Sequence, residues 1–177
     1  MGNTDTEAYV FSKRILVRPL GNANKKHFTM SPYQYVVSLR IWHPSLPLEE
    51  ISEIVGRDAK HGWTAGTPRV SPKGKPLGGL RESSYWTSEL TATTEFSDPI
   101  EVEQAISAFI EGLAPISAFF KRVRAEGGKS EFFVGLFSDG NIVVDLEPSL
   151  MGRLANAALG ICLDYYPWKR DKVPAKE

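Results

Sequence analysis

The stretch YVVSLRIWHPSLPLEEISEIVG, residues 35–56, decides the fold, because a strand pattern runs directly into a helix pattern. Up to Trp42, apolar and more polar residues alternate, which predicts a strand with one apolar face. The second face carries Arg40, so we expect that face not to be sealed. Prolines then end the strand, and Pro47 suits the first turn of a short amphipathic helix that ends at Gly56.

Further strands and helices are expected downstream of this unit. Strands are predicted at 83–91, 131–137, 141–146 and 161–166, and helices from 97–98 to the glycines at 127–128 and over 148–160. Pro115 interrupts the first of these helices, because proline cannot bond to the preceding turn. The turn sequence SDGN at 138–141 predicts a hairpin that joins the strand before it to the strand after it.

Two other segments have patterns that are less regular. Residues 57–82 are rich in Gly and Pro and predict a long loop, with a short strand expected near 67–70. Apolar residues occupy both faces of 131–137, which predicts a central strand covered at least partly on both sides.

The order of these elements predicts a single α+β domain. A strand, a proline-led helix and a glycine stop occur at 35–56 and again at 141–160, which indicates an internal duplication. We therefore expect a ferredoxin-like fold or a duplicated βαβ-type mixed sheet, with helices mainly on one face and the other face available. The domain is expected to span 33–167. Residues 1–32 would form an arm, with an added edge strand, and 168–177 a charged, flexible tail.

Several segments resemble DUF4279, a bacterial family of uncharacterised proteins. The resemblance rests on the stretch quoted first, on HGWTAGTPR at 61–69, on SSYWTSEL at 83–90, and on the later motifs GLFSDGN and LDYY. It covers roughly residues 33–166 and consists of hydrophobic strands with Gly, Trp and Pro landmarks. The resemblance implies a shared fold in a bacterial protein, and it implies no activity and no catalytic residues.

The composition excludes some classes of function. The chain has 177 residues with 21 basic and 21 acidic side chains, so its formal net charge is zero. That balance argues against a protein that only coats DNA or a membrane surface. The single cysteine, Cys162, cannot form an internal disulfide or a thiolate metal cluster and is expected to be a buried strand residue. No signal-peptide pattern and no long apolar span occur, which predicts a cytoplasmic protein without a membrane partner.

The sequence contains no recognisable catalytic motif. Its three histidines, His27, His43 and His61, are not spaced for metal binding with one another or with the cysteine. Zinc-protease motifs, nucleophile elbows, phosphate-binding loops and dinucleotide fingerprints are all missing. His43 follows Trp42 and is interpreted as a residue at the end of a strand. We therefore predict no catalytic residues, no metal site and no cofactor.

The best candidate site lies in and beside the basic, aromatic loop at 57–82. Five residues could form a groove for an anion, a nucleic-acid segment or an acidic protein surface: His61, Trp63, Arg69, Arg81 and Trp86. Aromatic stacking combined with cations is how proteins hold single strands, and Trp and Arg also anchor protein interfaces. The alternative is that Trp63 and Trp86 fill the core while the basic residues are only solvated.

A second candidate is a carboxylate inside the last strand. Asp164 lies between apolar neighbours, so it needs a partner or water. Arg40, on the polar side of the first strand, is a conceivable partner. The alternative is an aspartate on a sheet surface that faces solvent.

These observations leave three hypotheses for the function. The first is a non-enzymatic binding module that engages another protein in the bacterial cytoplasm, for example as an immunity protein that blocks a toxin. The second is binding of RNA or single-stranded DNA through the 57–82 loop, with salt-dependent affinity. The third is an enzyme that acts on a small anionic ligand, with His61 and Asp164 as the only titratable candidates.

Overall fold

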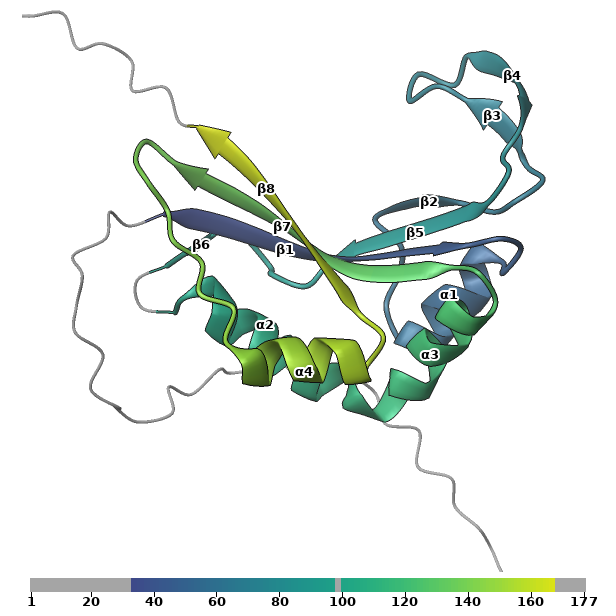
Figure 1. Cartoon of the computed structure of the whole chain (residues 1–177). Helices are drawn as coiled ribbons and strands as arrows, with labels where there is room; N and C mark the ends of the chain where they lie inside the picture. The colour runs from purple at the N-terminus through teal and green to yellow at the C-terminus, as the bar shows by residue number, and fades with distance from the viewer. Residues whose placement is uncertain (1–32, 98–99, 168–177) are drawn as a thin grey trace, which may run out of the picture.

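The fold is a twisted sheet with helices packed against one side of it (Figure 1). The computed structural model describes residues 33–97 and 100–167. The predicted arm at 1–32, part of the predicted helix start and the predicted tail at 168–177 lie outside these residues. The main sheet contains β1 (Gln34–His43), β2 (His61–Trp63), β5 (Ser84–Glu89), β6 (Glu95–Phe96), β7 (Lys129–Ser138) and β8 (Gly160–Pro167). Their order is β2-β5-β1-β7-β8, with β6 beside β1; β7 and β8 run parallel, and the other described pairs are antiparallel.

The strand predicted from the opening stretch lies at the centre of this sheet. β1 pairs with β5 on one side and with β7 on the other. Val37, Leu39 and Ile41 are fully buried, whereas Ser38 and Arg40 alternate with them and turn to the opposite face. The predicted alternation is therefore confirmed.

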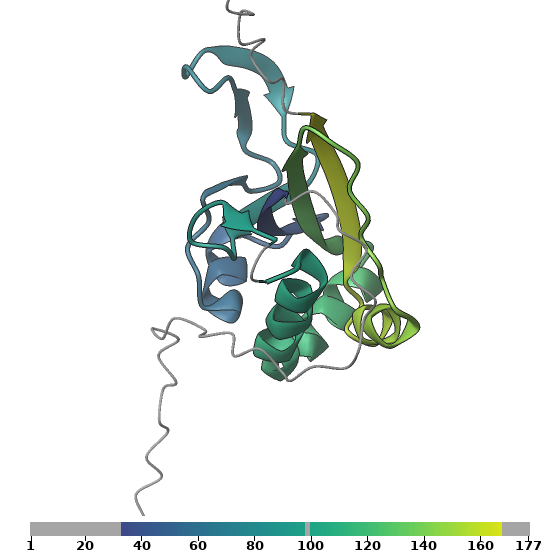
Figure 2. The same cartoon turned by 90° about the vertical axis from the view of Figure 1, so that its left-hand side faces the viewer.

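The four α-helices of residues 33–97 and 100–167 cover the face of the sheet that β1 buries (Figures 1 and 2). They are α1 (Leu48–Val55), α2 (Val102–Leu113), α3 (Ser117–Ala125) and α4 (Pro148–Asn156). Pro115 lies in a 3-10 turn, η1 (Ala114–Ile116), so the predicted break between α2 and α3 is confirmed. Buried side chains of the helices and of β1, β5 and β7 form one hydrophobic cluster. The predicted α+β class, with helices mainly on one face of a mixed sheet, is confirmed; the sheet is mostly antiparallel, and no described helix covers the opposite face.

The hairpin predicted after β7 does not form. Residues 141–147 are not a strand, and the chain passes through α4 before it returns as β8, parallel to β7. The alternation itself is real, because Ile142, Val144 and Leu146 pack against the core. However, the backbone N–H of Asp145 donates to a carboxylate of α2 (2.6 Å) instead of pairing with the sheet. The predicted second copy of the strand–helix unit therefore lacks its strand.

The long loop predicted at 57–82 contains three strands. β2 joins the main sheet beside β5, while β3 (Pro68–Val70) and β4 (Pro76–Leu80) form an antiparallel hairpin of their own. β3 corresponds to the short strand expected in this segment. The hairpin was missed because glycines and prolines mask its pattern; Gly74, at φ 76°, occupies the left-handed region in the turn.

Two helix boundaries also differ from the prediction. α2 begins at Val102 with Glu101 as its N-cap, and the hydroxyl of Ser97 accepts the N–H of Tyr33 (3.0 Å) and does not cap this helix. α4 ends before Gly160, and the residue in the left-handed region is Ala158, with φ 56°. The hydrogen bond of Ser97 and the left-handed backbone of Ala158 are tertiary features, so the sequence pattern did not predict either boundary.

Candidate functional site

The candidate site lies on the face of the sheet opposite the helices. Paired residues on neighbouring strands stand side by side on one face of a sheet. One such row runs from His61 in β2 through Thr87 in β5 and Arg40 in β1 to Glu131 in β7. The register therefore brings together polar residues that lie far apart in the chain.

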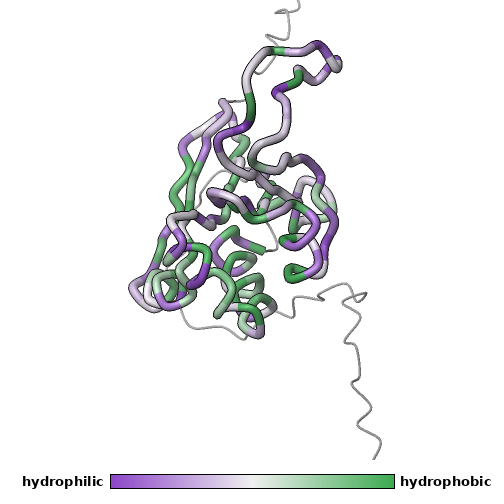
Figure 3. Tube along the Cα trace, turned by 90° about the vertical axis from the view of Figure 1, so that its right-hand side faces the viewer, coloured by the Kyte–Doolittle hydropathy of each residue, from purple (hydrophilic) through white to green (hydrophobic). Residues whose placement is uncertain are grey.

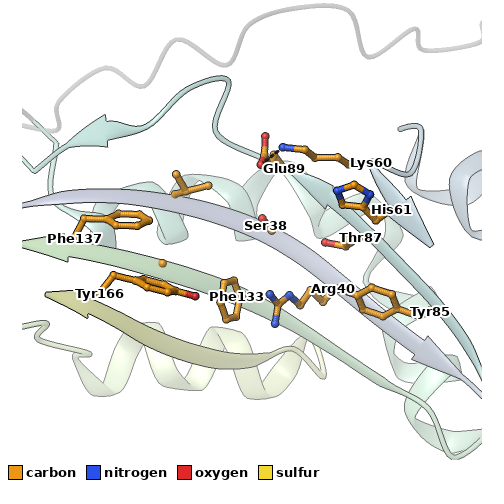
Figure 4. A pocket seen from close by; sticks show the side chains of 12 residues that line it. Ser38, Arg40, Lys60, His61, Tyr85, Thr87, Glu89, Phe133, Phe137 and Tyr166 are labelled. Carbon is orange, nitrogen blue, oxygen red and sulfur yellow. Dashed lines mark hydrogen bonds and ion pairs between the residues drawn. The ribbon is translucent and has the colours of Figure 1, made fainter. Parts of the chain in front are cut away.

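A hollow of about 410 Å³ opens in the middle of this face (Figure 4). Its polar lining consists of Ser38, Arg40, Lys60, His61, Thr87 and Glu89, and its remaining lining consists of Val36, Tyr85, Phe133, Gly135, Phe137 and Tyr166. Small-molecule sites typically measure about 300–1,000 Å³. The hollow is therefore large enough for a small ligand.

Two carboxylates beside the hollow already have cationic partners. Glu131 is only 4% exposed, and its carboxylate pairs with the ammonium group of Lys129 at 2.6 Å. Glu89 forms an ion pair with Lys60 at the rim. These pairs neutralise the acidic groups that would otherwise attract other cations.

Arg40 has no such partner. Its guanidinium carbon lies 3.2 Å from the centre of the Phe133 ring, and Figure 4 shows the side chain directed at that ring. Within residues 33–97 and 100–167, Arg40 makes no hydrogen bond and no ion pair. A guanidinium carries five N–H donors, so an unused set of donors faces the hollow.

Two stacked rings form the other end of the hollow. Phe137 and Tyr166 have ring centroids 5.1 Å apart and an interplanar angle of 17°. Gly135 lies beside them, where a Cβ would come within 3.4 Å of the Phe137 ring. The hydroxyl of Tyr166 donates to Asp164, and this hydrogen bond raises the pKa of Tyr166 above its ordinary value. Tyr166 is therefore protonated at neutral pH, and this end of the hollow is mainly apolar.

A row of aromatic rings crosses the same face at the edge of the hollow, and one member of the row, Tyr85, lines the hollow. The rings of Trp63, Tyr85 and Trp42 follow one another, with successive centroids 4.8 and 5.1 Å apart. A cation lies over the ring at each end of this row. The guanidinium carbon of Arg81 is 4.0 Å from the ring centroid of Trp63, and the ammonium nitrogen of Lys129 is 5.2 Å from that of Trp42. These rings contact one another and the cations, which leaves less ring surface for stacking with a nucleobase.

The β3–β4 hairpin is a second candidate surface. It projects beyond the sheet and stands clear of the helices (Figures 1 and 3). Every residue of its two strands is exposed. It carries three exposed apolar side chains, Val70, Leu77 and Leu80, and three basic ones in and beside its strands, Arg69, Lys73 and Lys75. The apolar side chains are 46 to 60% exposed, and the basic ones have no hydrogen-bond or ion-pair partner among the described residues.

The structure separates the residues that were predicted to form a single groove. His61 lines the hollow, whereas Arg69 lies on the hairpin. Trp63 and Arg81 stack on each other beside the hollow, and the indole N–H of Trp63 donates to the backbone of Ser83 (3.0 Å). Only part of the predicted set therefore shares one surface.

Trp86 was wrongly assigned to that groove. It is fully buried on the helix side of β5, where its indole N–H donates to the hydroxyl of Ser52 in α1 (2.9 Å). Alternation explains the difference, since its neighbours Tyr85 and Thr87 line the hollow on the other face. The alternative prediction, a core tryptophan, is the one that the structure bears out.

The predicted pairing of Arg40 with Asp164 does not form. Asp164 lies on β8 and accepts the Tyr166 hydroxyl, while Arg40 on β1 stacks on Phe133. His61 and Asp164 lie on β2 and β8, at opposite edges of the sheet, and Asp164 does not line the hollow. These two groups therefore cannot act together on one bound molecule.

Sequence reasoning missed the aromatic residues of β7. Phe133 and Phe137 lie on the open face and are half-buried by neighbouring side chains, not by a second layer of helices. Their spacing of four residues on a strand indicates a shared face. Which face that is depends on the pairing of β7 with β1, which the sequence does not display.

The described residues show neither a metal cluster nor a membrane-spanning helix. They contain no group of three or more His, Cys, Asp or Glu side chains placed to hold a metal ion. None of their helices combines the length and the apolar character that a membrane span requires. Cys162 is half-buried and is a free thiol.

Comparison with known proteins gives one result. A family profile described as "Domain of unknown function (DUF4279)" matches residues 33–168. Comparison with curated proteins gives no match, and comparison with solved structures gives none either. The matched region includes β1, the hollow and the hairpin, and it agrees with the resemblance seen in the sequence. The chain belongs to the DUF4279 family.

Proposed function

We propose that this protein is a non-enzymatic binding module of the bacterial cytoplasm that docks through its β3–β4 hairpin on an acidic surface of another protein. The observation that supports the proposal is a projecting hairpin that exposes three apolar side chains beside three cations with no ion-pair partner among the described residues. Covering apolar side chains is favourable, and unpaired cations steer a protein toward acidic groups. An immunity protein that blocks a toxin would be one case of this function.

The composition of the hairpin favours a protein partner over a nucleic acid. Phosphates pair with lysine and arginine, but they gain nothing from Leu77 and Leu80, which are 54 and 60% exposed. The open face adds little positive charge for a phosphate backbone that continued across the sheet, because Lys60 is paired with Glu89 and Lys129 with Glu131. Binding of RNA or single-stranded DNA is the second candidate, and the unpaired cations of the hairpin support it.

The test compares proteins that the immobilised full chain retains from lysate of the native host. Two variants remove the two parts of the proposed contact: Leu77→Ser with Leu80→Ser, and Lys73→Glu with Lys75→Glu. We expect a partner retained near stoichiometry by the wild type and bound at least about tenfold more weakly by both variants. The control is Lys121→Glu with Arg124→Glu, which makes the same change of charge on exposed positions of α3.

The outcomes separate the two candidates. A partner lost with both hairpin variants and kept with the α3 control supports the proposal. If the hairpin variants retain the same proteins as the wild type, docking through the hairpin is wrong. Labelled single-stranded RNA and DNA at low salt test the second candidate, for which the Lys73 and Lys75 changes should abolish binding while the leucine changes should not.

A relation to ferredoxin-like folds is the finer fold prediction, and it remains a proposal. β7, α4 and β8 form a parallel β-α-β connection, but β7 and β8 are adjacent, whereas the split β-α-β unit of such folds has another strand between its two parallel strands. β1 and β5 are also adjacent, and they are antiparallel. A solved relative in which another strand separates these two would support the relation.

A further inference from the structure

We infer that the hollow on the open face of the sheet binds a small organic anion with a flat apolar body, and that Arg40 holds its anionic group. The hollow is distinct from the β3–β4 hairpin, so this inference goes beyond the docking function proposed above. Three features carry it: a cation that has no counter-charge within the described part of the chain, hydroxyl groups beside it that form no hydrogen bond there, and an apolar end of matching size.

The first feature is the charge of Arg40. Its side chain is half-buried in the middle of the sheet, where a cation without a counter-charge is costly. The carboxylate directly across the strand pair, that of Glu131, is engaged by Lys129 at 2.6 Å. Arg40 instead stacks on Phe133, with its guanidinium carbon 3.2 Å from the ring centroid. The N–H donors of a guanidinium lie in its plane, so this stacking contact leaves all of them free. A carboxylate or phosphate could accept two of these donors at once.

The second feature is the set of polar groups that flank Arg40. Thr87 lies beside it in the same cross-strand row, and His61 lies beyond Thr87. Ser38 is two residues away on β1 and faces the same hollow. The side chains of these three neighbours form no hydrogen bond with any residue in the described part of the chain. They can therefore donate to the lone pairs that Arg40 leaves free on the oxygen atoms of a bound anion.

The third feature is the apolar end of the hollow. Phe137 and Tyr166 stack on each other there, and Gly135 leaves the space between these rings and Phe133 without a side chain. Inorganic phosphate would leave this end unfilled, whereas a fused aromatic ring would cover it. A volume of about 410 Å³ suits a small molecule of this kind. The chemistry therefore calls for an anionic head joined to a flat apolar body.

The experiment titrates the full chain with 2-naphthoate, with its neutral analogue 2-naphthalenemethanol and with inorganic phosphate, by calorimetry and by NMR. We expect 2-naphthoate to bind at least about tenfold more tightly than either of the other probes. Arg40→Met, which keeps the length and the apolar stem, should weaken 2-naphthoate at least about tenfold. Arg40→Lys keeps the charge but loses the two-pronged geometry, and it should give an intermediate affinity.

A matched control and a second variant keep the test decisive if Arg40→Met folds poorly. Arg122 also lies over an aromatic ring, that of Phe119 at 5.5 Å, but it is paired with Glu50 outside the hollow. Arg122→Met should bind 2-naphthoate as the wild type does. Gly135→Val fills the apolar end and should weaken 2-naphthoate while leaving phosphate unchanged.

Two results would overturn the inference. One is a wild type that binds no 2-naphthoate at millimolar concentration. The other is a folded Arg40→Met protein with the affinity of the wild type. The hairpin variant Lys73→Glu with Lys75→Glu should bind 2-naphthoate normally, so failure of the docking function and failure of this site are distinguishable.

Discussion

His43 shows how a histidine can be structural in a chain that offers few catalytic candidates. The side chain is 4% exposed, and its Nδ1 accepts the backbone N–H groups of Ser45 (3.2 Å) and Leu46 (2.9 Å). Since Nδ1 is an acceptor, Nε2 carries the proton and donates to the carboxylate of Glu126 (2.8 Å). The ring thus fixes the turn that leads from β1 to α1 and ties it to the end of α3.

Removing this ring should destabilise the protein. We expect His43→Ala to lower the free energy of unfolding by about 1–3 kcal/mol, because two backbone N–H groups lose their acceptor in a buried turn. His61→Ala is the matched control, since His61 is exposed and makes no hydrogen bond with the described residues; its effect should stay within about 0.5 kcal/mol. Urea unfolding of both variants measures the difference. Equal losses would show that the His43 bonds contribute nothing to folding.

At the scale of elements, the sequence predicts patterns that are local and fails where pairing is distant. The alternation of 35–42 and the break at Pro115 depend on neighbouring residues, and both are confirmed. The alternation of 141–146 reports an extended segment with one buried side, but it does not say whether the backbone pairs with a sheet. Likewise, Arg40 and His61 were predicted site residues, but they meet in one hollow only through the pairing of β2, β5 and β1. No local pattern encodes that register.

The β3–β4 hairpin should be dispensable for the stability of the sheet. Its strands pair with each other, and all their residues are exposed, so its removal uncovers little apolar surface. We expect replacement of residues 68–80 by two glycines, between Thr67 and Arg81, to shift the thermal midpoint by no more than about 4 °C. Thermal unfolding followed by circular dichroism measures the shift. If the variant without the hairpin lost its cooperative thermal transition, the hairpin would be supporting the fold. That result would weaken its assignment as a docking element.

The molecule as a whole uses the two faces of its sheet differently. One face is sealed by the helices around a single hydrophobic cluster, and it holds the fold together. On the other face, aromatic and charged side chains cover one another in pairs, which keeps that face soluble without a second helical layer. The described hollow lies where this pairing is incomplete, beside Arg40. Ligand binding of the kind inferred for this face would therefore leave the core unchanged.

Two buried tyrosines on the face that the helices cover predict how the stability of the whole fold responds to alkaline pH. Tyr33 and Tyr35 are 5% and 2% exposed, and their hydroxyl groups bond to the backbone that leads into α2. Burial raises the pKa of Tyr35 from 10.0 to about 12 and raises that of Tyr33 as well. An unfolded tyrosine loses its proton near pH 10, so above this pH the unfolded chain releases protons that the folded chain retains.

The stability that these two groups contribute is therefore complete below pH 10 and falls as the pH rises toward their raised folded pKa values, of which that of Tyr35 is about 12. We expect the free energy of unfolding to fall more steeply with pH across this interval for the wild type than for Tyr35→Phe. The difference in slope should correspond to the release of up to one additional proton per molecule on unfolding. Urea unfolding at a series of pH values, with tyrosinate absorbance recorded alongside, measures both slopes. Identical slopes would mean that Tyr35 ionises as readily in the folded protein as in the unfolded chain, which would contradict its burial beneath α2.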